Sequence, residues 1–145
     1  MELAKEKGIV GDQRYFGRLS RDTGKPSRRQ VSLIEREKLA EHAAALAIPS
    51  PIPPGAVRSN IETSGVKLGT LLGQEIEIGG AVLYVHSLRD PCSKMDAICQ
   101  GLRERMMHGQ QGVMAEVRCS GTIRVGDPIR LRSPGLNSGA TIPDP

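Results

Sequence analysis

The residues best suited to chemistry surround Cys92, where an apolar, strand-like run gives way to a helix-like run. Asp90 is a good N-cap, and Pro91 suits the first helical position, where its missing N–H costs nothing. Cys92 would then lie in the first turn, where the helix dipole, together with Arg89 and Lys94, lowers a thiol pKa. A thiolate attacks sulfur and binds soft metals. Cys92 is therefore the candidate catalytic residue and metal ligand.

The cysteines also allow a plainer interpretation. A free cysteine is often a small buried hydrophobe, so a structural role for Cys92 stays open on residue type alone. Cys99 and Cys119 are predicted to be buried, because each lies in phase with an apolar stripe. The three cysteines fit neither a disulfide framework nor a zinc or iron–sulfur spacing. With no signal peptide or membrane-length apolar run, we expect a cytoplasmic protein without membrane attachment.

Composition limits the classes of ligand. The 145-residue chain has a net charge of +4 and a pI near 9.2. Its basic residues alternate with acidic ones, and aromatics for base stacking are few, so nucleic-acid binding is not expected. A local site for a phosphate-bearing small molecule is favoured instead. We expect one domain over residues 8–132 and a disordered tail over 133–145.

The first half of the chain predicts one strand, one helix and one hairpin. Residues 28–34 read as a short strand that runs into a helix through Ala47, and Ser32 with Glu35 fits a capping box. Residues 75–86 alternate in polarity around Gly-Gly, which predicts a β-hairpin. Residues 1–7 are charged and are expected to be frayed.

The second half predicts a further helix after Cys92, closed by glycine at 109 and 112. A strand over 113–117 follows, and then a hairpin that pairs 122–125 with 129–131. Seventeen glycines and ten prolines imply many tight turns between short strands. The expected fold is mainly β with α, a distorted β-barrel or sandwich with two or so peripheral helices.

Several short fragments follow one another in a distinctive order along residues 8–131. They are Gly8–Asp12, Arg29–Ile34, Arg58–Ile61, Thr63–Gly65, Leu72–Gly79, Pro91–Cys92, Gly112–Val117 and Gly121–Leu131. This order resembles the MOSC domain, the C-terminal domain type of molybdenum cofactor sulfurases, in its stand-alone bacterial form. The resemblance implies a β-barrel related to the pyruvate-kinase barrel domain.

The resemblance also implies a role for the candidate cysteine and a cofactor site. Cys92 would ligate molybdenum of the molybdopterin cofactor, or would carry sulfur as a persulfide. Arg58 and Asn60 match the family segment that contacts the cofactor. The other expected cofactor-binding residues are Arg14, Arg29 and Ser32, because arginine forks recognise phosphate oxygens. Gln13–Arg14 stands where the family often has histidine.

Three hypotheses for function follow. The first is a molybdopterin-binding oxidoreductase that acts on N-hydroxylated or similar small molecules and takes electrons from a separate flavin or haem protein. The second is a sulfur carrier that accepts sulfur on Cys92 from a cysteine desulfurase, with pyridoxal phosphate only in that partner. The third is a non-catalytic binding module. His42, His86 and His108 suggest no hydrolase, although His86 could tune Cys92.

Overall fold

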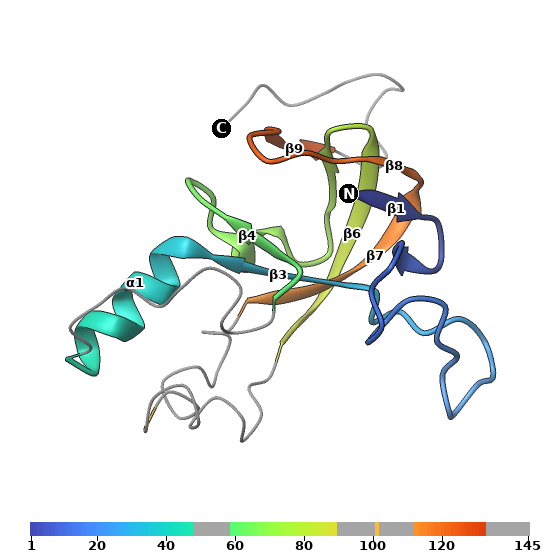
Figure 1. Cartoon of the computed structure of the whole chain (residues 1–145), viewed down its shortest axis with the longest axis horizontal. Coiled ribbons are helices and arrows are strands. Elements are labelled where there is room, and N and C mark those ends of the chain that lie inside the picture. The colour runs from blue at the N-terminus through green and yellow to red at the C-terminus, as the bar shows by residue number, and fades with distance from the viewer. Residues whose placement is uncertain (48–58, 90–100, 102–111, 133–145) are drawn as a thin grey trace. The chain divides into compact units, whose positions relative to one another are not determined.

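The computed structural model of the chain describes residues 1–47, 59–89, 101 and 112–132, and these residues are mainly β (Figure 1). The described residues divide into two compact units. The first unit contains residues 1–31, 71–87 and those from 114 onward. The second unit contains residues 32–70 and 88–113.

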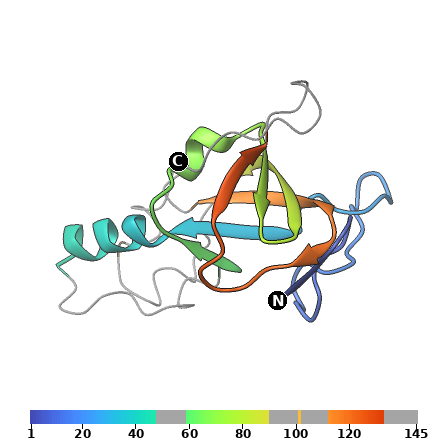
Figure 2. The same ribbon diagram turned by 90° about the horizontal axis from the view of Figure 1, so that it is seen from above.

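The first unit is built on a curled antiparallel sheet. Its strands lie in the order β7 (Val113–Cys119), β6 (Ala81–Leu88), β5 (Glu75–Ile78) and β9 (Ile129–Arg132). In Figure 2 these strands curl around a common interior. Most of the apolar side chains of β5, β6 and β7 are buried. The buried side chains include Ile76, Leu83, Val85, Ala115 and Val117. The hairpin predicted over residues 75–86 is confirmed, with Glu75 opposite Tyr84.

A smaller sheet completes this unit, in the order β2 (Gly8–Ile9), β1 (Glu2–Ala4) and β8 (Gly121–Thr122). The expectation of a frayed N-terminus is therefore wrong, since β1 pairs on both sides. The hairpin predicted between 122–125 and 129–131 is also wrong. A turn does form, with Asp127 Oδ2 accepting the Arg124 N–H at 2.8 Å. However, β8 pairs with β1 and β9 pairs with β5.

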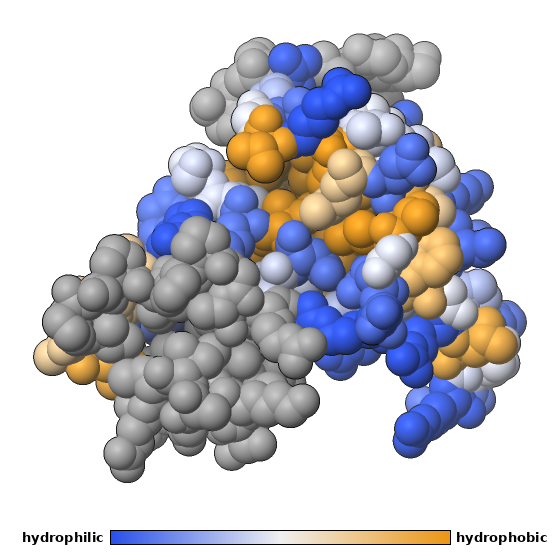
Figure 3. Space-filling model, viewed as in Figure 1, coloured by the Kyte–Doolittle hydropathy of each residue, from blue (hydrophilic) through white to orange (hydrophobic). Residues whose placement is uncertain are grey.

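The surface of this unit includes exposed apolar side chains. Figure 3 shows an apolar area over its strands, with polar side chains around it. Among the described residues, the large apolar side chains that stay exposed in this unit are Met1, Val10, Leu19, Leu72 and Val125. Single exposed apolar side chains are ordinary in soluble proteins, so they indicate no function by themselves.

The second unit contains β3 (Val31–Glu35), parallel to β4 (Ile61–Thr63), the helix α1 (Arg36–Ala45) and the 3-10 helix η1 (Leu68–Leu71). The predicted passage from strand to helix is confirmed, and α1 buries Leu39 and Ala43. The capping box is wrong. Ser32 lies within β3, and Glu35 makes no side-chain cap. Its Oε1 instead accepts the Leu68 N–H at 2.6 Å, where η1 begins.

Other contacts fix the start of α1 to β4 and to the loop that follows it. Glu37 Oε2 accepts the Gly65 N–H at 2.7 Å, and this bond lowers the pKa of Glu37. Arg36 Nη1 lies 2.9 Å from Glu62 Oε1. Among the described residues, no helix combines the length and the apolar character that crossing a bilayer requires.

The predicted fold class, mainly β with a barrel-like curled sheet, is confirmed. One sequence prediction in β7 is wrong, because Cys119 is exposed. Val117 is the last buried residue of that strand, so the alternation extends the buried face two residues too far. The second predicted helix, its cysteines at 92 and 99, and the tail at 133–145 lie outside the described residues.

Candidate functional site

Ser32 and Asn60 form the centre of the candidate site. The backbone N–H and the Oγ–H of Ser32 donate to Asn60 Oδ1, at 2.9 and 3.0 Å. The Asn60 N–H in turn donates to Ser32 Oγ at 2.9 Å. Ser32 is fully buried in β3, and Asn60 directly precedes β4. Two residues that are far apart in the sequence, both expected to bind cofactor, therefore lie in direct contact.

This contact also fixes which part of the Asn60 side chain can bind a ligand. A backbone N–H can only donate, so the oxygen of the Asn60 carboxamide must face Ser32. The Asn60 Nδ2 then has no hydrogen-bond partner within the part of the chain that the structure describes. Asn60 is half-buried, so this NH2 group is a donor held in one orientation.

Arg89 and Gly112, which lie on either side of the segment that contains Cys92, meet beside β3, the strand of Ser32. The Arg89 N–H donates to Gly112 O at 2.9 Å, and Arg89 is 7% exposed. Gly112 has a positive φ of 102°, and a Cβ there would overlap Leu33 O of β3. Arg89 and Gly112 therefore meet at β3, where Gly112 lies against Leu33, the residue after Ser32. Cys92 itself lies outside the described residues.

Ser59 adds a buried hydroxyl to this region, and sequence reasoning missed it. It is 9% exposed, and its Oγ has no hydrogen-bond partner among the described residues. A buried polar group without a partner is unfavourable, and such groups in native proteins often mark a binding role or an unseen ligand. A serine between Arg58 and Asn60 carries no sequence signal that separates it from an ordinary loop serine.

The structure says less about the other residues expected to bind cofactor, Arg29, Arg14 and Arg58. Arg29 is exposed just before β3, and its N–H donates to Ser27 Oγ at 3.2 Å. Arg14 is half-buried in the turn after β2, with its guanidinium 4.9 Å from the centre of the Tyr15 ring. Both belong to the first unit, whereas Ser32 and Asn60 belong to the second. Arg58 lies outside the described residues.

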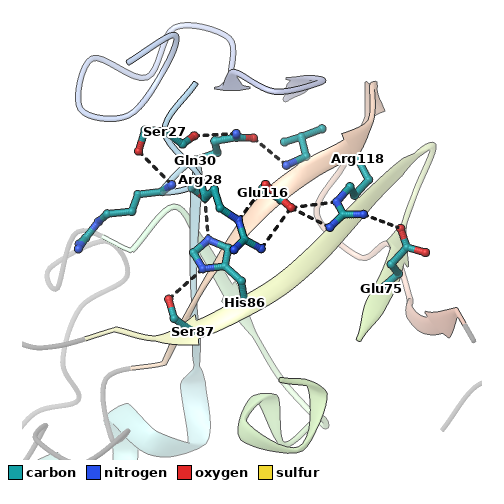
Figure 4. Close-up of polar contacts among 10 residues, drawn as sticks. Ser27, Arg28, Gln30, Glu75, His86, Ser87, Glu116 and Arg118 are labelled. Carbon is teal, nitrogen blue, oxygen red and sulfur yellow. Dashed lines mark hydrogen bonds and ion pairs between the residues drawn. The ribbon is translucent and has the colours of Figure 1, made fainter. Parts of the chain in front are cut away.

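The first unit also carries a charged network that sequence reasoning missed (Figure 4). Glu116 on β7 accepts from Arg28 at 3.3 Å and from Arg118 at 2.9 Å, and Arg118 reaches Glu75 at 3.9 Å. Arg28 and Arg118 lie 5.6 and 4.4 Å from the centre of the Tyr84 ring. The ion pair of Arg118 with Glu75 joins β7 to β5, which lie on either side of β6 in the sheet. No local motif predicts it.

His86 lies at one end of this network. Its Nε2 is 2.7 Å from Arg28 O, and its Nδ1 is 3.0 Å from Ser87 Oγ. A carbonyl can only accept, so Nε2 carries the proton and Nδ1 accepts from the Ser87 hydroxyl. Burial and the nearby charge of Arg28 lower the pKa of His86, partly offset by its bond to the Arg28 carbonyl. These contacts give His86 a structural role in the described chain.

The donors around Ser32 and Asn60 fit a polar, phosphate-bearing cofactor. The buried Ser59 hydroxyl and the Asn60 NH2 group can both donate hydrogen bonds, and acceptor oxygens are the complementary chemistry. In the described ranges, His, Cys, Asp and Glu side chains form no group of three or more that could hold a metal.

A family model described as the MOSC domain matches residues 13–130, most of the chain. No sequence among the curated proteins matches significantly. Several solved structures are similar. The YuaD protein from Bacillus subtilis superposes with a TM-score of 0.72 at 23% identity, covering 88% of this chain and 81% of that one.

The other similar structures are longer than this chain. The YiiM protein from Escherichia coli gives a TM-score of 0.64 at 22% identity and covers 77% of this chain. YiiM from Geobacillus stearothermophilus gives 0.65 at 24% identity and covers 75%. The chain spans 58% and 57% of the length of these two structures. At these identities the likeness shows that the fold is shared.

Proposed function

Because the chain belongs to the MOSC domain family, we propose that it binds the molybdenum–molybdopterin cofactor and acts as an oxidoreductase on small molecules. Cys92 would be the molybdenum ligand, and N-hydroxylated or similar compounds would be the substrates. When bound, the cofactor would supply the redox chemistry. Electrons would come from a separate electron-transfer protein.

One observation supports this proposal: the residues on either side of the Cys92 segment meet at β3, the strand whose Ser32 contacts Asn60. Arg89 and Gly112 are hydrogen bonded to each other, and Gly112 packs on Leu33. Cys92 is three residues from Arg89, and a chain advances at most about 3.3–3.6 Å per residue. The Cys92 Cα is thus at most about 11 Å from the Arg89 Cα. A soft thiolate within that reach of Arg89 would suit the metal of the cofactor.

The proposed roles of the chain's own residues follow from their chemistry. The Asn60 NH2 group would donate to an oxygen of the cofactor, and Ser32 would hold that group in position. Arg58 and Arg29 would contribute charge to phosphate binding, with Arg14 as a further candidate. Cys92 would bind the metal as a thiolate, which requires loss of its proton.

The proposal is tested by native mass spectrometry of the protein made in a molybdopterin-competent host. Wild type, Cys92→Ala and Cys119→Ala are compared, with Cys119 as the control because it is an exposed cysteine of the same chain. We expect a mass increment for molybdopterin plus molybdenum in wild type and Cys119→Ala, and its loss in Cys92→Ala.

Two other results would contradict the proposal. An increment of one sulfur atom on Cys92, with no pterin, would favour the sulfur-carrier hypothesis and a desulfurase as the donor. Bare protein in all three samples would favour the non-catalytic binding module. In the expected case, reduction of an N-hydroxylated compound by the loaded protein with an artificial electron donor is the next measurement.

A further inference from the structure

Ser59 is the most unusual polar residue of the second unit. Its side chain is more than nine-tenths buried, and its Oγ has no hydrogen-bond partner among the described residues. The nearby hydroxyl groups are satisfied: Ser32 Oγ bonds Asn60 twice, and Thr63 Oγ1 lies 3.5 Å from Ile34 O. A lone unsatisfied hydroxyl lowers the stability of a fold unless something else satisfies it.

The surroundings of Ser59 define the chemistry of that missing partner. Ser59 adjoins Asn60, whose carboxamide oxygen is fully engaged by Ser32 and whose NH2 group is not engaged among the described residues. Two donors therefore stand side by side in the sequence at the start of β4. A ligand that meets both must present hydrogen-bond acceptors, which phosphate and pterin oxygens provide.

We propose that the Ser59 hydroxyl donates a hydrogen bond to an acceptor oxygen of the bound cofactor, and so acts as a positioning residue beside Asn60. This inference rests on the proposed function. On this inference the unsatisfied Ser59 hydroxyl lowers the stability of the cofactor-free protein, and its hydrogen bond to the cofactor strengthens binding in the loaded protein.

Ser59→Ala should therefore weaken cofactor binding without weakening the cofactor-free fold. In Ser59→Ala the cofactor-free protein loses an unsatisfied polar group, so its unfolding midpoint stays equal to that of wild type or rises. The loaded variant loses one hydrogen bond to the cofactor. We expect the cofactor to dissociate roughly 3- to 10-fold faster, the usual effect of one such bond.

The experiment compares wild type, Ser59→Ala, Ser32→Ala and Ser64→Ala. Urea unfolding of the cofactor-free proteins gives stability. Release of cofactor after dilution, followed by the fluorescence of the oxidised pterin, gives the dissociation rate without any assay of activity. Ser32→Ala should lower stability, because it breaks the contacts with Asn60. Ser64→Ala, at an exposed position of the same unit, should change neither measurement.

The outcomes separate this inference from the proposed function. If loaded Ser59→Ala releases cofactor at the wild-type rate, the Ser59 assignment is overturned while the proposed function stands. The same holds if Ser59→Ala destabilises the cofactor-free protein as much as Ser32→Ala does. Wild-type protein that carries no cofactor overturns the proposed function and the Ser59 assignment together.

Discussion

Protonation of His86 links the stability of the protein to pH, because His86 lies at one end of the charged network of the first unit. In the neutral form of the ring, Nε2 donates to Arg28 O and Nδ1 accepts from Ser87. Protonation would remove that acceptor and place a positive charge near Arg28 and Arg29. The half-buried ring therefore binds its proton less readily in the folded than in the unfolded chain.

We expect a pH effect on stability with a defined sign. The folded pKa of His86 is lowered from 6.5, so the unfolded chain binds more protons below that pH. Stability due to neutral His86 is fully present above pH 6.5 and is lost as the pH falls toward the folded pKa. Urea unfolding of wild type and His86→Gln between pH 7.5 and 5 measures it. Parallel pH profiles for the two proteins would contradict this role.

Glu35 is the second residue with a testable role. It is 8% exposed, and its Oε1 accepts the Leu68 N–H at 2.6 Å. Glu35→Ala should lower the free energy of unfolding by about 1–3 kcal/mol, because a buried N–H loses its partner. Glu35→Gln keeps an acceptor oxygen and should lose less. Equal losses in the two variants, measured by urea unfolding, would contradict this explanation.

At the scale of residues, the family resemblance marked candidates whose role in cofactor binding stays a prediction. Ser32 and Asn60 were both expected to bind cofactor, and the structure brings them into contact. Glu35 was predicted to be part of a helix cap because its spacing from Ser32 matches one. Its real partner is far along the chain, at Leu68, and a local pattern carries no information on that pairing.

At the scale of elements, Gly112 connects the Cys92 segment to β3. Its positive φ and its contact with Leu33 O leave no room for a side chain. Gly112→Ala should lower the thermal midpoint by several degrees and reduce the amount of cofactor retained. Gly69→Ala is the matched control, because an added Cβ at Gly69 meets nothing within 4 Å. Equal effects of the two substitutions would show that the close approach is unimportant.

Elements were predicted well when their partners were close in sequence. The hairpin of β5 and β6 has a two-residue turn and a clear alternation, so its pairing could be read locally. The pairings of β1 with β8 and of β5 with β9 join distant residues. Hydropathy patterns give no pairing partner, so a local hairpin was predicted between 122–125 and 129–131 where none exists.

At the scale of the whole molecule, cofactor binding should raise stability by mass action. A ligand present at 100 times its dissociation constant adds about 2.7 kcal/mol. We expect loaded wild type and Cys119→Ala to melt several degrees above their cofactor-free forms. Cys92→Ala, prepared in the same way, should show no such difference by calorimetry. An equal difference in Cys92→Ala would mean that this thiol contributes nothing to binding.

The backbone hydrogen bond between Arg89 and Gly112 also has a consequence for evolution and engineering. With both ends held together, a flexible insert between them adds only loop-closure entropy, and each doubling of loop length costs about 0.6 kcal/mol. Insertions between residues 90 and 111 should therefore be tolerated far better than insertions in β5 or β6. Selection could then lengthen or exchange the segment between Arg89 and Gly112 while the pairing of β5 with β6 stays unchanged.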